Sequence, residues 1–406
     1  MTIELRMAAP DEVEVFMAAI ARAFGEELRD EDVASWRARL EPDRIFVGWD
    51  GSTAVGGGAV YSLRLTVPGG EVAAGGVTAV GVQPTHRRQG LLRQMMGRMF
   101  SQARERGEPI AILWASEASI YQRFGYGLAA FKARFDLPTE RSAFRDEQAP
   151  SGRMRLLERA EAERLLPPVF DAFRVGRPGA WARDATWWAD ILADPEWHRH
   201  GGGPRYFAVH EREGRATGYT RYHLHEDWDD RGPRNVLHVY EAIALDAEAE
   251  RDMWRFLCDV DLVGTVQYRL AAVDHPLLHL LLEPSALGFT LGDALWLRVL
   301  DLQAALAGRR YGATDRLVLE VSDEGLPDNA GRWELTAGAG APSVARTAAA
   351  PDVALDVADL GAVYLGGVSF AQLARAGRVT GLTADALRRA DALFGSPVAP
   401  WSPMVF

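Results

Sequence analysis

This chain of 406 residues has a single cysteine, and it contains no long apolar run. Because Cys258 has no second cysteine to pair with, neither an intrachain disulfide nor a cysteine-based zinc site can form. No segment approaches the roughly 18 apolar residues that a membrane span requires. Residues 1–11 contain no apolar signal-peptide core. These absences predict a cytoplasmic protein with no membrane span.

Acidic residues outnumber basic residues, 56 to 45, and the chain contains almost no lysine. The formal net charge of −11 disfavours nucleic acid as a partner and favours cationic small molecules. Lys132 is the only lysine among the 45 Lys and Arg residues, a composition typical of a GC-rich genome. An arginine is therefore informative only through its place in a motif.

The most informative stretch runs from Val77 to Met96. Val80 and Val82 alternate around Gly81 as in a β-strand, and an apolar helical face begins at Leu91. The basic loop between them contains a glycine. Unpaired N–H groups at a helix start, at the positive end of its dipole, attract phosphate. The residues alone therefore predict a pyrophosphate site, with a solvated surface turn as the alternative.

The order of predicted elements divides the chain into three segments. Residues 1–145 alternate helices and strands, and residues 127–137 should form the last strand of that segment. Residues 146–300 repeat this order, which indicates a weak internal duplication. Residues 301–406 have a different pattern, in which predicted strands with alternating polarity are followed by predicted helices.

The loop Arg-Arg-Gln-Gly-Leu-Leu at residues 87–92 resembles the acetyl-CoA signature of the GNAT superfamily of N-acetyltransferases. That signature reads Arg/Gln-x-x-Gly-x-Gly/Ala, so Leu92 departs from it at the last position. In that family a strand contacts the pantetheine arm and the loop cradles the pyrophosphate. The resemblance implies an acetyl-CoA site formed by Val80, Gly81, Val82, Arg87, Arg88, Gln89, Gly90, Leu91, Leu92, Arg93, Ser116 and Glu117.

A second motif follows the apolar strand predicted at residues 110–115. Tyr121 stands three residues before Phe124-Gly125-Tyr126, as in acetyltransferases of this type. The resemblance implies that Tyr121 protonates the departing CoA thiolate. A phenol, with an ordinary pKa of about 10, stays protonated at neutral pH and can donate. The alternative is that Tyr121 only packs, and Tyr126 is expected to pack.

Further short sequence motifs are spread over nearly the whole chain. By these motifs the chain resembles the Eis (enhanced intracellular survival) family of bacterial acetyltransferases. They include residues 64–69, 115–117, 295–298, 319–323 and 364–366. The resemblance implies an α/β fold with two tandem GNAT domains, catalytic at 1–145 and degenerate at 146–300. It also implies a sterol-carrier-protein-like domain at 301–406, whose C-terminus reaches the active site, and a homohexamer.

The second GNAT domain should be structural. Where the first domain has its basic loop, residues 245–252 read Leu-Asp-Ala-Glu-Ala-Glu-Arg-Asp, without an Arg-x-x-Gly. These acids would repel a pyrophosphate. Residues 274–289 contain no tyrosine that could act as the acid.

The resemblance also implies that the terminal carboxylate, on Phe406, acts in catalysis. An α-carboxylate, with an ordinary pKa of about 3.5, can hold a cationic amine but is a poor lone base. Glu117 is a second candidate for the base. The alternative for Phe406 is a hydrophobic anchor.

The family's acceptor pocket is acidic and aromatic, which suits cationic amines through charge and cation–π contact. Glu26, Trp36 and Trp188 are the residues expected to line it. A solvated acid and two core tryptophans are the alternatives. Ala79 and Val405 stand where the family has an aromatic residue and an acid, which predicts a wider and less charged pocket.

Metal is not expected, because His223 and His225 have no fixed third ligand and the mechanism needs none. The prediction is an acetyl-CoA-dependent N-acetyltransferase that works by direct attack in a ternary complex. Its acceptors are amines of cationic small molecules, aminoglycoside- or polyamine-like, or lysine side chains. The alternative is a non-catalytic acyl-CoA- or lipid-binding scaffold, which requires a large apolar cavity in residues 301–406.

Overall fold

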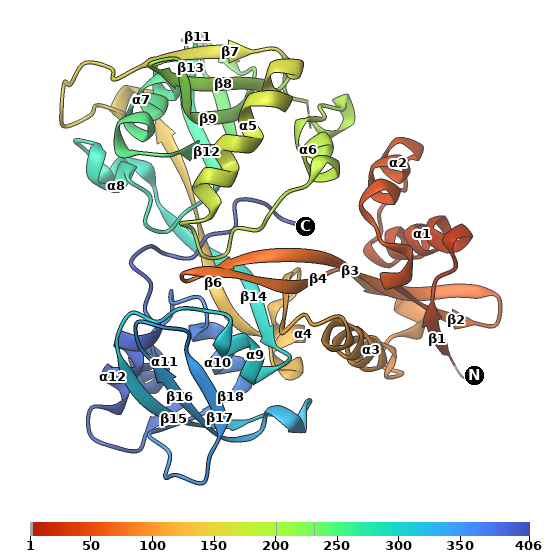
Figure 1. The fold of residues 1–406 in the computed structure, drawn as a ribbon. Coiled ribbons are helices and arrows are strands. Elements are labelled where there is room, and N and C mark those ends of the chain that lie inside the picture. The colour runs from red at the N-terminus through yellow and green to blue at the C-terminus, as the bar shows by residue number, and fades with distance from the viewer. Residues whose placement is uncertain (1–2, 200, 231) are drawn as a thin grey trace. The chain divides into compact units, whose positions relative to one another are not determined.

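The computed structural model describes residues 3–199, 201–230 and 232–406 (Figure 1). Backbone contacts divide the chain into two compact units. Unit 1 comprises the residues up to Ala130, Leu295–Pro397 and Val405–Phe406. Unit 2 comprises Phe131–Ala294 and Val398–Met404. In the described ranges, no helix is both long and apolar enough to cross a membrane.

The N-terminal part of unit 1 is a sheet covered by helices, with strand order β1-β2-β3-β4-β5-β14. Neighbours are antiparallel except β4 and β5, which are parallel and joined through α3. The long hairpin of β3 and β4 is drawn in orange in Figure 1. The elements are β1 Glu4–Met7, α1 Val13–Phe24, α2 Asp30–Arg39, β2 Ile45–Asp50, β3 Thr53–Val67, β4 Gly70–Val82, α3 Leu91–Glu105, β5 Ile110–Trp114, α4 Ala118–Tyr121 and β14 Thr290–Val299.

The core of this sheet forms where α3 turns its apolar face inward. Leu91, Met95 and Met99 follow each other at helical spacing and are buried. They share one cluster with Tyr121 and Tyr126. The packing of α3 therefore fixes both its own start and the tyrosine motif.

The strand predicted at residues 127–137 is confirmed as β6 (Gly127–Pro138), but its second half does not join the sheet of β5. In β6, residues Ala133–Pro138 pair with β13 of unit 2. The strand next to β5 is β14, which pairs with it from Leu295↔Trp114 to Val299↔Ile110. β5 is almost wholly buried and reads Ile-Ala-Ile-Leu-Trp, so its pattern does not identify its partner.

Unit 2 repeats the arrangement of the first sheet. Its strand order is β6-β13-β12-β9-β8-β7, and α7 joins the parallel strands β12 and β13. Lys132 lies half-buried on β6. The remaining elements are β7 Arg153–Leu157, α5 Arg159–Arg174, α6 Ala185–Leu192, β8 Tyr206–Arg212, β9 Arg215–His225, β10 Trp228–Asp229, β11 Gly232–Pro233, β12 Asn235–Ala244, α7 Ala247–Cys258, β13 Val263–Ala271 and α8 Leu277–Leu280.

The C-terminal part of unit 1 has its own sheet of order β17-β16-β15-β18-β19. Arg309 is completely buried in this part of the unit and donates hydrogen bonds to the carbonyls of Tyr364 and Phe394, at the ends of two helices. The rings of Tyr311, Tyr364 and Phe394 surround its guanidinium. The elements are α9 Leu302–Ala307, β15 Asp315–Ser322, β16 Gly331–Ala337, β17 Ser343–Arg346, β18 Val353–Asp356, α10 Val357–Val363, α11 Phe370–Arg375, β19 Val379–Gly381 and α12 Ala386–Phe394.

The placement of β14 predicts how fragments should behave. A fragment of residues 1–145 lacks β14 and exposes the apolar edge of β5, so we expect it to aggregate without a cooperative thermal transition. Adding a fragment of residues 286–406 should restore a cooperative transition in circular dichroism. The same second fragment with Leu297→Pro should fail, because proline cannot donate to the ladder at Leu297↔Ile112. Cooperative folding of fragment 1–145 alone would show that β14 is dispensable.

Candidate active site

A β-bulge interrupts β4 at the predicted ligand strand. Its register with β3 passes from Ala59↔Thr78 to Gly57↔Gly81, so Ala79 and Val80 together face Gly58. Ala79 has a φ of 49°, in the left-handed region that alanine rarely adopts. A bulge leaves an extra residue out of the ladder. Backbone N–H and C=O groups beside Val80 are therefore available to a ligand.

β4 and β5 also part at this point. Their register pairs run from Ala74↔Ile110 to Gly76↔Ile112, while β4 continues to Val82 and β5 to Trp114. The last residues of both strands thus have no register pair with each other in the part of the chain described. Ligands of parallel sheets bind at the carboxyl ends of the strands, where such strands part.

The loop between β4 and α3 presents an uncapped helix start. Gly90 is the N-cap of α3, with a φ of 84° and no side-chain cap. Arg88 has a φ of 63°, and the Nε of Arg87 donates to the carbonyl of Val82 over 3.3 Å. The side chains of Arg87, Arg88, Gln89 and Arg93 are exposed. The first N–H groups of α3 are therefore free for an anion.

Leu92 departs from the family signature without blocking the loop. Its side chain is half-buried and packs against the core cluster that contains Met95 and Tyr121. The side chain thus points into the core, and the backbone of the first turn stays accessible.

The corresponding helix start in unit 2 is already occupied by side chains of the protein. Asp246 caps α7 by accepting from the N–H of Ala249 at 2.9 Å. The guanidinium of Arg212 binds Asp246 at 2.5 Å and Glu248 at 2.5 Å. β12 keeps a register shift at Tyr240, so the bulge persists although the phosphate-binding turn does not.

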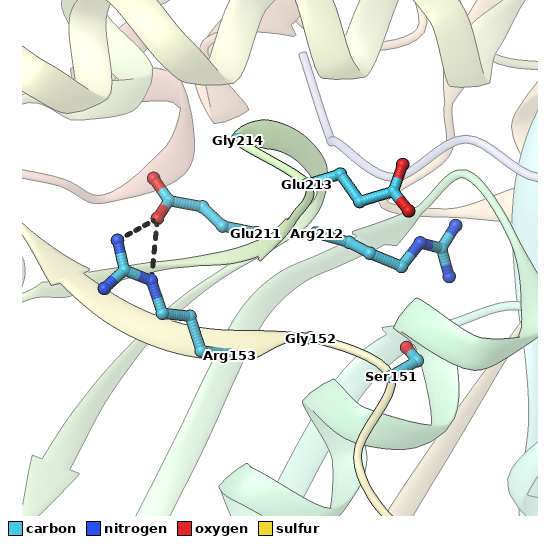
Figure 2. Close-up of a pocket in the computed structure, with 7 residues that line it drawn as sticks. All are labelled: Ser151, Gly152, Arg153, Glu211, Arg212, Glu213 and Gly214. Atoms are coloured by element: carbon cyan, nitrogen blue, oxygen red, sulfur yellow. Dashed lines mark hydrogen bonds and ion pairs between the residues drawn. The ribbon is translucent and has the colours of Figure 1, made fainter.

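A pocket of about 520 Å³ lies beside Arg212 in unit 2. Figure 2 shows that one wall is an ion pair, in which Arg153 donates twice to Glu211, at 2.9 and 3.2 Å. Arg212 is held by Asp246 and Glu248. The two arginines of the pocket are thus already paired with carboxylates. Its lining consists of Ser151, Gly152, Arg153, Glu211, Arg212, Glu213 and Gly214.

Tyr121 ends α4 and is 7% exposed. Burial raises the pKa of its phenol, and the nearby charge of Glu117 raises it further. Tyr121 therefore keeps its proton at neutral pH and can donate it. Glu117 is the exposed N-cap of α4, and Ser116 precedes it, also exposed.

Tyr126 packs, as predicted. It is completely buried. Its ring meets that of Tyr121 edge-on at 5.9 Å and that of Phe100 at 5.9 Å. Burial raises the pKa of Tyr126 far above its ordinary value. Tyr126 thus supports the ring of Tyr121 from within the core.

The C-terminal residue lies against β4. The ring of Phe406 meets Tyr61 edge-on at 6.4 Å. A Cβ atom on Gly76 would lie 3.2 Å from Cε2 of Phe406. Gly76 is the last residue of β4 that pairs with β5, and Figure 1 shows the C-terminus beside the β3–β4 hairpin. The terminal residue is thus close to the place where the two strands part.

The first helix approaches β4 at the same strand end. A Cβ on Gly81 would lie 3.0 Å from Cβ of Ala23 and 3.7 Å from Cε2 of Phe24. Glu26 follows the end of α1 and is exposed, and Trp36 is half-buried on α2. Phe24 is 47% exposed and is a further candidate for this site that the sequence motifs did not indicate. An apolar residue just before the helix-ending Gly25 was the available signal.

Trp188 lies in unit 2, on α6, and is buried. Its ring contacts Phe170 at 5.8 Å, and the guanidinium of Arg183 lies 5.2 Å from its centre. A part for Trp188 in acceptor binding stays a prediction.

The histidines that could have suggested a metal lie in unit 2. His223 stacks on His238, with ring centres 4.8 Å apart. No group of three or more His, Cys, Asp or Glu side chains with metal-binding geometry occurs among the described residues.

Comparison with known domains agrees with this architecture. Residues 4–129 and 179–299 each match the acetyltransferase (GNAT) domain. Residues 302–403 match the sterol carrier protein domain. These matches confirm the predicted two GNAT domains followed by a sterol-carrier-like domain.

Full-length relatives include acetyltransferases. An uncharacterized N-acetyltransferase of Streptomyces avermitilis is 39% identical over 412 residues, which cover 100% of both chains. N-acetyltransferase Eis of Mycobacterium tuberculosis is 32% identical over 415 residues, covering 98% of each chain. The crystal structure of Eis1 from Mycobacterium abscessus has 32% identity and a TM-score of 0.85, covering 99% of this chain and 100% of that chain.

Two glycines with similar positive φ angles test the anion site. Gly90 has a φ of 84° and Gly107, just past the other end of α3, a φ of 74°; a Cβ on either meets nothing within 4 Å. Alanine at either position should therefore cost a similar free energy of unfolding, about 1 kcal/mol. Only Gly90→Ala puts a methyl group where a pyrophosphate must approach, so it should weaken CoA binding about tenfold. Isothermal titration with CoA measures this, and equal affinities of the two variants would contradict the assignment.

Proposed function

The chain belongs to the Eis-like family of GNAT N-acetyltransferases, and from this premise we propose that it acetylates amines of cationic small molecules with acetyl-CoA. Aminoglycoside- or polyamine-like amines and lysine side chains are the proposed acceptors. One observation carries the proposal. The uncapped start of α3, the bulge of β4, the tyrosine motif and the C-terminal residue all lie in the same compact unit.

The residues fit a bound acetyl-CoA, which supplies the acetyl thioester. The N–H groups of the first turn of α3, with Arg87, Arg88 and Gln89, would hold the pyrophosphate. The bulged backbone at Val80–Val82 would hold the pantetheine arm and the thioester carbonyl as negative charge develops on its oxygen.

Tyr121 supplies the proton that the reaction needs. In the proposed direct attack, the acceptor nitrogen bonds to the carbonyl carbon and the carbon–sulfur bond breaks. The hydroxyl of Tyr121 then donates its proton to the departing sulfur. Its raised pKa keeps the donor protonated over the whole neutral range.

The acceptor side carries negative charge. Glu26 follows α1, and the first turn of α2 contains Asp30, Glu31 and Asp32. A cationic acceptor would be attracted to these acids and could stack on Trp36. The carboxylate of Phe406, or that of Glu117, would take up the proton that the amine releases. Trp188 is a further proposed contact.

The scaffold alternative receives no support from the C-terminal domain. The interior of this domain contains the guanidinium of Arg309, with three aromatic rings packed around it. A lipid tail would have to displace a buried cation whose Nη atoms are both hydrogen-bonded.

Assembly and location extend the proposal. We propose a homohexamer, which rests on the resemblance to the family. We also propose a cytoplasmic location, which rests on the single cysteine together with the lack of an apolar run long enough to span a membrane. Sedimentation velocity at several protein concentrations tests the hexamer, and a mass of one chain would refute it.

The central experiment measures CoA release with a thiol reagent and a panel of polyamines and aminoglycosides. Cys258 should not interfere, because burial raises the pKa of its thiol to about 12. Tyr121→Phe should lower kcat by about 100-fold or more with little change in the KM for acetyl-CoA. Since burial raises the pKa of Tyr121, kcat should not fall on the alkaline side below about pH 10. No CoA release with any amine would refute the enzyme function, and full activity of Tyr121→Phe would remove Tyr121 as the acid.

The C-terminal carboxylate is tested by changing its position. Deleting Phe406, or adding Gly-Ser after it, should lower kcat about tenfold or more, because both displace the carboxylate. Phe406→Leu keeps the carboxylate and should retain more activity than either. Steady-state kinetics with one polyamine acceptor measures the three variants. Equal rates in all of them would leave Phe406 as an anchor only.

A further inference from the structure

Arg298 is a buried cation that lies next to Gly125 of the tyrosine motif. It sits on β14 opposite Ala111 of β5 and is completely inaccessible to solvent. Its Nη2 donates to Oδ1 of Asp323 at 2.7 Å. Among the described residues, its Nε and Nη1 have no hydrogen-bond partner. One edge of the guanidinium is thus anchored, and the other edge is unpaired.

The anchor is itself rigid. Oδ1 of Asp323 also accepts from the N–H groups of Gly325 at 3.1 Å and Leu326 at 2.9 Å. Its Oδ2 accepts from Nδ2 of Asn329 at 3.0 Å, and Asn329 is buried. Asp323 follows β15 of the sterol-carrier-like domain. That domain therefore fixes the orientation of Arg298.

The unpaired edge faces the Phe-Gly-Tyr corner. A Cβ on Gly125 would lie 2.7 Å from Nη1, 2.8 Å from Cζ and 2.9 Å from Nε of Arg298. Gly125 also has a φ of 79°. Position 125 requires glycine for two reasons. Its φ angle is positive, and the guanidinium of Arg298 fills the space that a side chain would occupy.

This corner is next to the ring of Tyr121, the proposed acid. Tyr126 follows Gly125, and its ring meets that of Tyr121 at 5.9 Å. In the described chain, the hydroxyl of Tyr126 also lacks a hydrogen-bond partner. Burial raises the pKa of Tyr126, and the charge of Arg298 acts on it in the opposite direction. The guanidinium of Arg298 is therefore close enough to affect the pKa of Tyr126, whose ring contacts that of Tyr121.

We propose that Arg298 is a positioning residue for acetyl transfer, which holds Gly125 and Tyr126 in place so that the hydroxyl of Tyr121 reaches the departing sulfur. The inference rests on the proposed role of Tyr121 as the acid. It gives the sterol-carrier-like domain a part in catalysis, because Asp323 aligns the guanidinium. A buried cation with an unpaired edge destabilises a core compared with an apolar side chain, so packing alone does not explain its presence.

The test is a double-mutant cycle on the full chain, because two residues that act through one another are not additive. Arg298→Met and Tyr121→Phe are made singly and together. Steady-state kinetics with acetyl-CoA and one polyamine is then measured well below the melting temperature. Arg298→Met should lower kcat about tenfold while the KM for acetyl-CoA changes less than about twofold, because a displaced catalytic group loses rate. In the Tyr121→Phe background, the same change should lower kcat less than about twofold.

Arg44 provides the matched control. It is also completely buried in unit 1, and it binds Glu108 through both Nη atoms at 2.6 Å. Arg44→Met should lower the melting temperature as Arg298→Met does, but should leave kcat unchanged. Arg298→Lys keeps a positive charge opposite Asp323, so it should recover part of the kcat that Arg298→Met loses.

Each outcome decides the inference. An unchanged kcat in Arg298→Met, or an equal loss in both backgrounds, would overturn it while leaving the proposed acetyltransferase function intact. Full activity of Tyr121→Phe would instead remove the proposed acid, and this inference with it. If Arg298→Met does not fold, Arg298→Lys and Asp323→Asn are taken through the same cycle and must show the same loss of additivity.

Discussion

The pairing of β5 with β14 is the constraint on which the rest of unit 1 depends. β5 carries the tyrosine motif at its end, and β14 carries Arg298 behind that motif. β14 comes from the part of the sequence that follows the second GNAT domain, while the second half of β6, which follows the tyrosine motif, pairs within unit 2. The two GNAT domains have thus exchanged their last strands. The final strand of the second domain thus completes the sheet of the first.

The two units differ in one local feature at the position of the proposed anion site. Both contain a bulged strand, a helix and a parallel strand. They differ in the residue at the helix start. Gly90 leaves the first N–H groups of α3 open, whereas the carboxylate of Asp246 caps α7. A side chain that caps a helix thus takes up an N–H group that an external anion would otherwise bind.

The sequence predicts those features that a short stretch of residues determines. Gly90, Leu92 and Asp246 lie in local patterns that specify a helix start, and the structure has helices beginning there. The partner of β5 could not be predicted, because Ile110–Trp114 is apolar on both faces and any apolar strand could pair with it. Phe24, Arg298 and Asp323 were missed for a related reason. Their proposed roles rest on what lies beside them in space, and a buried arginine has the same local pattern as an exposed one.

The lone lysine has a consequence for an enzyme of this chemistry. Acetylation requires a nucleophilic amine, and a guanidinium stays protonated at any physiological pH and is not one. Almost all positive side chains of the protein are guanidinium groups, and Lys132 is half-buried on β6. The protein is therefore nearly inert toward the reaction that it is proposed to catalyse, and its ion pairs keep their charge in the presence of its own acetyl donor.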